Sequence, residues 1–431
     1  MTDSKKTTGQ DSTRDRYRHI QGGLDLAVDQ AETRRLHEMF IVDTDCHVFE
    51  PFSSFSNYLP SKWRKEYENV KIQSESEQYK EDYRIFTDNS TEDMDPVKLK
   101  LLKLFFDLTS FRLRTKEHEL TTQFDFFQHG RVRRSEIPFD YLAGMKSEQI
   151  IDTFVNRMKD IGIKRSVIFP NTLLNIGNHP DHDFEVAVSN AFTDYMIDEF
   201  LDKYPELLSC VLVPANSPDR AADLIDRVGS EKGIIGIMIT AHRPTLAGNE
   251  SWIPIYEAAR KKDLPVCFHA SLSYIPPYDQ LKDLLAFYSL AFPINLVLHL
   301  TSLVTSGVPE RFPDLKFVFM EGGVTFIPWI MNRLDSMYMM MKSEAPVLKK
   351  LPSEYIKEFY YSSQPLERPQ KQSDLKFAFD SFNADRQLMY ASDYPHFDFD
   401  VPSVIYNLPF LSPESKKNIL GENARRVFRL D

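Results

Sequence analysis

Three polar residues alternate in the stretch DTDCHVFEP, which spans residues 43–51 and follows a short apolar step. Asp43, Asp45 and His47 are spaced two apart, so in a β-strand their side chains would share one face. Charged side chains on a buried strand are costly unless they are paired or coordinate a cation. Because imidazole nitrogen and carboxylate oxygen suit Zn²⁺, Mn²⁺ or Fe²⁺, this spacing favours a divalent metal site.

The segments that would have to position these residues alternate between helix-like and strand-like patterns. From residue 147 onward, amphipathic stretches precede short apolar runs such as SVIFP, SCVLVP, IIGIMI, PVCFH and KFVFM. Continuous apolar runs are typical of strands that are buried on both faces. Together with residues 40–48 and the runs YIKEFYYSS and RQLMYASDYP, they bring the total to eight strands. The pattern predicts an α/β fold, a (β/α)8 TIM barrel with a large insertion after strand 1.

Length and composition set the domain organisation. A chain of 431 residues fits one such barrel with insertions. Residues 1–38 are mostly polar and charged and are expected to form a disordered N-terminal tail, which leaves residues 39–431 for the barrel. Residues 52–146 fit no repeating unit and are expected to be an insertion that covers the mouth as a lid or forms a partner interface.

Composition also excludes several classes of partner. Acidic residues outnumber basic ones by 63 to 52 and the basic residues are scattered, which argues against nucleic acid. No apolar run of 18 or more residues suggests a membrane span, and the amino terminus lacks the apolar core of a secretory signal, so we expect a cytoplasmic protein. Cys46, Cys210 and Cys267 lie singly in apolar runs and are expected to be buried free thiols.

In a TIM barrel the functional residues lie where strands end and the following loops begin. The apolar runs here end at or beside a uniform set of polar residues, and these are the predicted metal ligands: Asp45, His47, His269, Glu321 and Asp393. His242 and Arg243 follow the fourth strand and could bind a substrate carboxylate, since Arg is a good anion clamp.

Two further histidines are candidates for substrate contacts. His299 lies in the apolar helix-like segment INLVLHLTSLV, where it either is satisfied by a neighbouring backbone group or overhangs the mouth and contacts the substrate or a second metal. His396 lies just after Asp393 and is the other candidate.

Five motifs give the chain a family resemblance: DTDCHVFEP, PVCFHAS, SGVPERFPDLKFVFMEGG, YASDYPHFDFD and ILGENARRVF. They resemble the amidohydrolase-related family, in the branch that includes aminocarboxymuconate semialdehyde decarboxylase and γ-resorcylate decarboxylase, over about residues 40–430. The resemblance implies that Asp45, His47 and His269 bind metal and that Asp393 both binds it and handles the proton of metal-bound water. The decarboxylases carry a His within HGG near the end of strand six, whereas this chain has Glu321 before its Gly-Gly pair.

The resemblance leaves the number of metal ions open. The fourth strand, IIGIMIT, has no lysine for the carboxylated bridge of other amidohydrolases. Either one ion is held by Asp45, His47, His269 and Asp393, or Glu321 draws in a second. Zinc is the favoured metal, with manganese or iron as alternatives.

The predicted function is a metal-dependent hydrolase, in which activated water attacks an amide, ester, lactone or C–C carbonyl of a small molecule. His269 and Asp393 are its predicted catalytic residues, with Asp393 accepting and returning the proton. The alternatives are a decarboxylase of an aromatic or unsaturated acid, a dinuclear iron or manganese oxygenase, and a non-catalytic barrel subunit of an assembly. We expect a homo-oligomer, or a hetero-oligomer with a related subunit.

Overall fold

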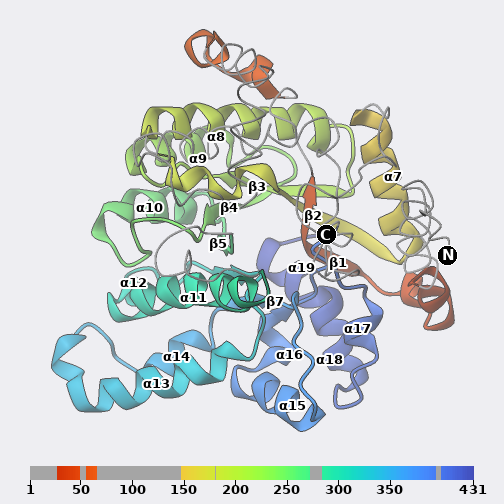
Figure 1. Cartoon of the computed structure of the whole chain (residues 1–431), viewed down its shortest axis with the longest axis vertical. Coiled ribbons are helices and arrows are strands. Elements are labelled where there is room, and N and C mark those ends of the chain that lie inside the picture. The colour runs from red at the N-terminus through yellow and green to blue at the C-terminus, as the bar shows by residue number, and fades with distance from the viewer. Residues whose placement is uncertain (1–26, 49–54, 66–146, 180, 272–283, 395–398) are drawn as a thin grey trace, which may run out of the picture.

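The computed structural model describes residues 27–48, 55–65, 147–179, 181–271, 284–394 and 399–431. Within these ranges eight parallel strands are hydrogen-bonded in chain order, from β1 to β8. They are β1 (Ile41–Val48), β2 (Ile163–Pro170), β3 (Leu207–Leu212), β4 (Ile234–Thr240), β5 (Val266–His269), β6 (Phe317–Met320), β7 (Tyr360–Ser362) and β8 (Leu388–Met389). The predicted TIM barrel is confirmed, with helices outside the strands (Figure 1).

The barrel is closed between its first and last strands by a loop backbone. β8 is only two residues long and pairs with β7. The seam with β1 is formed by the segment that follows β8, where the amide of His47 donates to the carbonyl of Tyr394 over 2.8 Å. The amide of Asp393 donates in turn to the carbonyl of Asp45 over 2.7 Å. The two ends of the described barrel therefore meet at the predicted metal ligands.

The strands owe their burial on both faces to their apolar sequences. All seven residues of β4 are buried, and so are all six of β3. Gly236 on β4 leaves room for a neighbouring thiol, because a Cβ there would lie 2.9 Å from Sγ of Cys210. Cys46, Cys210 and Cys267 are all buried and free, as predicted.

The helical segments of the described chain surround these strands. In the first half they are η1 (Leu36–Glu38), η2 (Ser56–Tyr58), α7 (Ser147–Asp160), η5 (Thr172–Asn178), α8 (His182–Met196), η6 (Ile197–Leu201), α9 (Pro218–Val228), η7 (Glu250–Trp252) and α10 (Ile253–Lys261). In the second half they are α11 (Leu284–Thr305), α12 (Val308–Arg311), α13 (Phe326–Met341), η9 (Lys342–Glu344), α14 (Pro352–Ile356), α15 (Gln372–Ser381), α16 (Ala384–Gln387), α17 (Ser403–Tyr406), α18 (Pro413–Lys417), η10 (Asn418–Glu422) and α19 (Asn423–Phe428).

Local sequence explains where these helices begin. The side chain of Asp181 accepts a hydrogen bond from the amide of Phe184 and so caps α8. α9, α14 and α18 each carry a proline in their first turn, where no backbone donor is lost.

The structure corrects the predicted start of the ordered chain. Residues 27–33 are helical, and Ala31 and Leu36 are buried although both fall within the expected disordered tail. Leu36 packs where the chain enters β2, because a Cβ at Gly162 would lie only 3.2 Å from its Cβ. The few apolar residues of this stretch are thus used to cover the barrel, while residues 1–26 lie outside the described chain.

Most of the expected insertion lies outside the described residues, which resume at residue 147. Its first part is described and packs on the barrel. Phe55 is fully buried, with its ring centroid 6.0 Å from that of Phe192 on α8. The prediction that the insertion forms a lid or partner interface stays a prediction.

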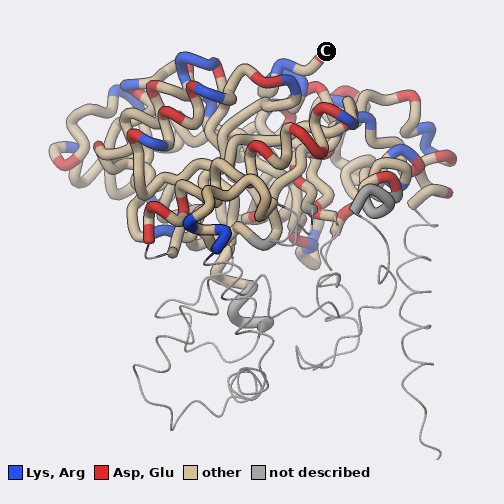
Figure 2. Tube along the Cα trace, turned by 90° about the horizontal axis from the view of Figure 1, so that it is seen from above, with Lys and Arg blue, Asp and Glu red and all other residues tan. Residues whose placement is uncertain are grey.

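Charged residues are interspersed over the described chain. Figure 2 shows basic and acidic residues alternating along the same elements, without one continuous basic stripe. Among the described helices, none combines the length and the apolar character that crossing a bilayer would require.

Candidate metal centre

The centre begins at an irregularity in β1. Asp43 pairs with Ser166 of β2 and Cys46 pairs with Ile168, so β1 has one extra residue in this interval, which is a β-bulge. Asp45 lies within the bulge. Its carboxylate Oδ1 is 3.5 Å from Nε2 of His47, and both side chains are fully buried. Bulges commonly redirect side chains next to functional sites, and this one brings two polar residues of β1 together.

His269 joins this pair from the other side of the barrel. It is the last residue of β5, where it pairs with Thr240 of β4 and Met320 of β6. Its Nε2 lies 3.0 Å from Oδ1 of Asp45. One ligand atom from each of Asp45, His47 and His269 falls within 4.8 Å of the other two, which is close enough for the three to share an ion.

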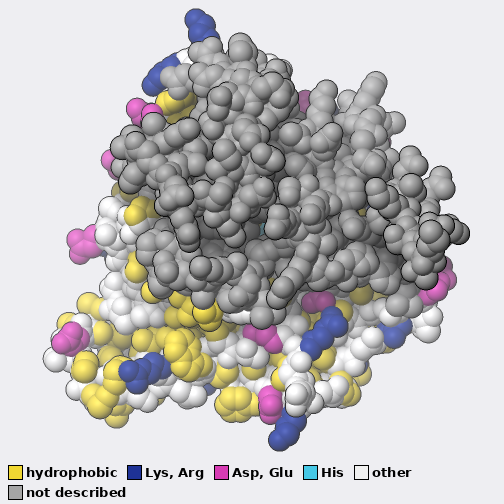
Figure 3. Space-filling view, in the orientation of Figure 1, with side chains coloured by type: hydrophobic (Ala, Val, Ile, Leu, Met, Phe, Trp, Pro, Cys, Tyr) yellow, Lys and Arg dark blue, Asp and Glu magenta, His cyan; other side chains and the backbone are white. Residues whose placement is uncertain are grey.

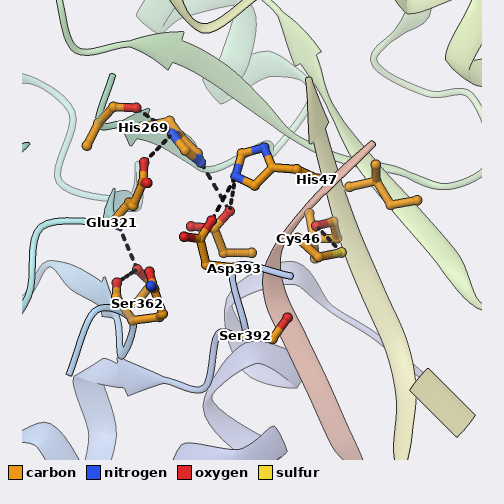
Figure 4. A network of polar contacts seen from close by, with 12 residues as sticks. Cys46, His47, His269, Glu321, Ser362, Ser392 and Asp393 are labelled. Carbon is orange, nitrogen blue, oxygen red and sulfur yellow. Dashed lines mark hydrogen bonds and ion pairs between the residues drawn. The ribbon is translucent and has the colours of Figure 1, made fainter. Parts of the chain in front are cut away.

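Asp393 completes the set from the seam of the barrel. Its Oδ1 lies 3.1 Å from Nε2 of His47 (Figure 4). Its backbone is left-handed, with φ of 59°, a conformation that costs free energy for a residue with a Cβ. Such strain persists only where the surroundings fix it, and it is typical of functional sites. The structure therefore brings together Asp45, His47, His269 and Asp393, as the sequence predicts.

The hydrogen bonds of the two histidines show that these residues fit a cation. Nδ1 of His47 faces the carbonyl of Pro170 at 3.1 Å, and Nδ1 of His269 faces the carbonyl of Ala270 at 2.7 Å. A carbonyl only accepts, so both Nδ1 atoms carry hydrogen and each neutral ring has its lone pair on Nε2.

Both Nε2 atoms point at carboxylate oxygens, which also carry lone pairs. A divalent metal ion held by these nitrogens and carboxylates would place a positive charge between the facing lone pairs.

Burial and neighbouring charges shift the proton affinities in this centre. Burial raises the pKa of Asp393 to about 6, although its hydrogen bond with His47 opposes the shift. Burial disfavours the charged form of His269, but the Asp45 carboxylate, the Ala270 carbonyl and Asp393 together outweigh burial, so the pKa of His269 is raised. Asp393 and His269 therefore each retain a proton more readily than they would in water.

Glu321 is not part of this group, which corrects its prediction as a metal ligand. Its Oε2 lies 3.5 Å from Nδ1 of His269, on the side of the ring away from Asp45 (Figure 4). Its backbone is also left-handed, with φ of 62°, and its amide donates to Oγ of Ser362 over 2.9 Å. Glu321 directly follows β6, and its carboxylate lies on the Nδ1 side of the His269 ring.

His242 lies just beyond the carboxyl end of β4, whose last residue, Thr240, pairs with His269. Nδ2 of Asn178 contacts both the carbonyl of His242, at 2.9 Å, and Nδ1 of its ring, at 2.5 Å. The carbonyl can only accept, so this atom of Asn178 is the amide nitrogen and the ring Nδ1 accepts as well. Burial lowers the pKa of His242 to about 4, helped by Arg243. His242 is therefore neutral near pH 7 and carries its hydrogen on Nε2.

Arg243 is engaged by the protein itself. Its Nη1 lies 2.8 Å from Oε1 of Glu185 on α8, and both side chains are fully buried. Its Nε and Nη2 donate to the carbonyls of Thr240 and Val213. This geometry does not favour the predicted anion clamp, because three guanidinium nitrogens already have partners. A Cβ at Gly177 would lie 2.6 Å from Cζ of Arg243, so a glycine is needed where η5 passes over it.

His299 has the backbone partner that one of the two predictions required. Its Nε2 lies 2.8 Å from the carbonyl of Ala241, and its ring is fully buried and stacked on Trp252. Burial lowers the pKa of His299 to about 4. A fully buried ring gives no support to its prediction as a substrate contact. The predicted substrate contact His396 lies outside the described residues.

Sequence reasoning missed the groups that hold the residues of the predicted site in place. Ser362, Ser392, Asn178 and Glu185 all make buried or partly buried hydrogen bonds next to the centre. Ser392 directly precedes Asp393, which was the one usable signal. Ser362, Asn178 and Glu185 lie far in sequence from the predicted site residues that they contact.

The chain is similar to proteins of known family. A protein-family model described as "Amidohydrolase" matches residues 158–430. γ-Resorcylate decarboxylase from Rhizobium sp. (strain MTP-10005) is 21% identical over 309 residues, which cover 68% of this chain and 92% of that enzyme.

Solved structures share the fold. 5-Carboxyvanillate decarboxylase from Novosphingobium aromaticivorans, complexed with manganese and 4-hydroxy-3-methoxy-5-nitrobenzoic acid, superposes with a TM-score of 0.61 at 20% identity, over 91% of this chain and 97% of that one. The amidohydrolase map2389c from Mycobacterium avium subsp. paratuberculosis gives a TM-score of 0.64 at 17% identity, over 90% and 99% of the two chains.

Proposed function

Because this chain belongs to the amidohydrolase family, whose model matches residues 158–430, we propose that it is a metal-dependent decarboxylase of an aromatic carboxylic acid. The observation that carries the proposal is the buried donor set of Asp45, His47 and His269, which fits a divalent ion, in a chain that spans 92% of a curated decarboxylase. A substrate with a phenol beside its carboxylate is the natural candidate, since the relatives act on γ-resorcylate and 5-carboxyvanillate.

This proposal corrects the hydrolase that the sequence favours. The curated relatives include γ-resorcylate decarboxylases and an aminocarboxymuconate semialdehyde decarboxylase. Motifs for a metal-bearing barrel do not specify what happens to the substrate, because the same site can activate water or hold a carboxylate. The hydrolase prediction relied on the activation of water, whereas the relatives support a site that holds a substrate carboxylate.

We expect one divalent ion, held by Asp45, His47, His269 and Asp393. A bound ion would polarise a substrate oxygen and so stabilise the negative charge that develops on the ring. Zinc is favoured by the sequence, whereas the 5-carboxyvanillate decarboxylase was solved with manganese, so both metals need testing. Two iron or manganese ions per chain would favour the dinuclear oxygenase instead.

The residues of the chain supply the proton. Decarboxylation breaks the bond between the ring carbon and the carboxylate, CO₂ leaves, and the ring carbon takes up a proton. Asp393 is placed to deliver it, because its carboxyl group lies at the centre, 3.1 Å from Nε2 of His47. The carbonyl of Ala270 binds the Nδ1 side of His269, with the Glu321 carboxylate 3.5 Å from the same atom, so that Nε2 faces the centre.

His242 is proposed to bind the substrate. Asn178 fixes its tautomer, and its neutral ring offers an N–H donor beside the centre. A neutral donor can bind a phenol or carboxylate oxygen without adding a second positive charge to the site. Arg243 is not proposed for this role, since Glu185 already pairs with it.

The test uses purified protein stripped of metal and reloaded with Mn²⁺ or Zn²⁺. 2,6-Dihydroxybenzoate and 5-carboxyvanillate are offered, and CO₂ release and the phenolic product are measured. In D₂O the product should carry deuterium at the carbon that lost CO₂. Asp393→Asn should lower turnover by about 10²- to 10⁴-fold, the contribution of a general acid.

The metal-free protein is the matched control and should release no CO₂. A panel of amides, esters and lactones is run in parallel. Hydrolysis of that panel, with no CO₂ from any aromatic acid, would overturn the proposal. Full turnover by Asp393→Asn would remove Asp393 from the mechanism.

A further inference from the structure

A second carboxylate on β1 holds the loop that carries Asp393. Asp43 lies within β1 one alternation before Asp45 and is fully buried. Its Oδ1 accepts from the amide of Ser392 over 2.8 Å, and its Oδ2 accepts from the hydroxyl of Ser392 over 2.5 Å. One carboxylate therefore binds both donors of a single residue, and that residue directly precedes Asp393.

The hydroxyl of Ser392 extends this connection past Asp393. Its Oγ accepts from the amide of Tyr394 over 3.0 Å while it donates to Asp43. Asp393 is thus flanked on both sides by backbone amides that are anchored, directly or through one hydroxyl, to Asp43. Its own amide donates to the carbonyl of Asp45. The backbone amides of Ser392 and Asp393 thus donate to β1, and that of Tyr394 donates to the hydroxyl of Ser392.

Such fixation is needed because Asp393 adopts a left-handed backbone. This conformation is less stable than the right-handed one for a residue with a Cβ, so a loosely held loop would leave it. In the left-handed conformation the Asp393 carboxylate reaches Nε2 of His47 at 3.1 Å. A change of φ at residue 393 would carry the carboxylate away from the other donors.

We propose that Asp43 and Ser392 act together as a positioning pair, which holds Asp393 in its left-handed conformation and thereby sets the affinity of the centre for its metal ion. This inference rests on the metal site of the proposed function but not on the reaction. Oδ1 of Asp43 also accepts from the backbone amide of Asp45 over 3.3 Å. The side chain of Ser392 bonds to Asp43 and Tyr394, so the pair acts on Asp393 by fixing its loop. Groups that orient a metal ligand in this way typically contribute 10- to 100-fold to metal affinity.

The experiment measures Mn²⁺ binding to the metal-free full chain by isothermal titration calorimetry. Ser392→Ala removes the hydroxyl, and with it the contacts to Asp43 and Tyr394, and should raise the Kd for Mn²⁺ by about 10-fold or more. The matched control is Ser209→Ala on β3, where an equally buried hydroxyl donates to the carbonyl of Ile168 over 2.8 Å. It should lower thermal stability but leave the Kd unchanged.

A double-mutant cycle tests whether the two residues act as one unit. Asp43→Ala should also raise the Kd for Mn²⁺. The Kd of the double variant should be no higher than the higher of the two single-variant values. The electron paramagnetic resonance spectrum of bound Mn²⁺ should change in both single variants but not in Ser209→Ala.

Three results would overturn the positioning pair: an unchanged Kd in Ser392→Ala, an equal loss in Ser209→Ala, or losses that multiply in the double variant. Failure of the proposed function is separable from these results. If no CO₂ is released but the Mn²⁺ affinities change as expected, the positioning pair is supported and the decarboxylase proposal fails.

Discussion

Buried carboxylates of this chain differ in what compensates their charge. Asp45 and Asp393 face histidines, whereas Asp400 is 7% exposed and its main ionic partner is the largely exposed Arg368, at 3.1 Å. Burial raises the pKa of Asp400 to about 6, against an ordinary value near 4, although Arg368 opposes the shift. An ion pair with an exposed partner contributes little to stability, so burial of the charged Asp400 side chain lowers the free energy of unfolding.

Asp400 should make unfolding pH-dependent. Its folded pKa is raised, so the folded state binds more protons between about pH 4 and pH 6, and stability falls as the pH rises through that window. Asp400→Asn lacks this dependence. The free energy of unfolding of wild type should therefore drop by about 2 kcal/mol relative to Asp400→Asn between pH 4.5 and pH 7.5, measured by urea denaturation. A difference that does not vary with pH would show that Asp400 titrates normally.

Among the elements, the loops after β2 and β4 depend on one buried cation. Arg243 joins α8 through Glu185, the end of β3 through Val213 and the end of β4 through Thr240, and η5 crosses it at Gly177. Four elements are thus held at the mouth by a single side chain. This role explains an arginine after β4 without any substrate carboxylate.

The structural role of Arg243 can be tested against the substrate-clamp prediction. Arg243→Met should lower the free energy of unfolding by about 3–5 kcal/mol, because it leaves Glu185 charged, buried and unpaired. The double variant Glu185→Leu/Arg243→Met should recover most of that loss, since apolar replacement of a buried pair is often neutral. Guanidinium denaturation measures both. Unchanged stability with a raised KM would instead support the clamp.

Sequence predicts the elements better than their details, for physical reasons. Long apolar runs such as β3 and β4 were found because burial on both faces constrains every residue. β8 has only two residues, and the seam beside it is built from backbone hydrogen bonds that any sequence could make. The candidate ligands Asp45, His47, His269 and Asp393 can be proposed from the sequence because charge at strand ends is unusual. The direction of the Glu321 side chain cannot be predicted in the same way, because it depends on a left-handed backbone conformation at that residue.

At the scale of the whole molecule, apolar side chains remain exposed on the described surface. They are Leu290 and Leu298 on α11, Trp329, Met339, Met340 and Met341 on α13, Val347, and Phe377 on α15. Figure 3 shows hydrophobic side chains gathered in the region where Figure 1 labels α13 and α14. Large exposed apolar surfaces on soluble proteins commonly mark contacts with other chains. The homo-oligomer expected from the sequence stays a prediction.

Oligomeric state is measured directly by sedimentation velocity at micromolar concentration. We expect a mass that is a multiple of the 50.2 kDa chain. Met340→Lys, which adds a charge at one of the most exposed apolar positions, should shift the distribution toward the single chain. A wild-type protein that sediments at 50.2 kDa at all concentrations would contradict the prediction.

The seam between β1 and the segment after β8 has a consequence for biosynthesis. His47 and Asp393 face each other across it but lie far apart in the chain, so His47 is synthesised long before Asp393. A nascent chain on the ribosome can form most of its strands and still hold only part of the donor set. Secure capture of the ion would have to wait until residue 393 has emerged and joined β1, so loading with metal would mark a chain whose barrel has closed.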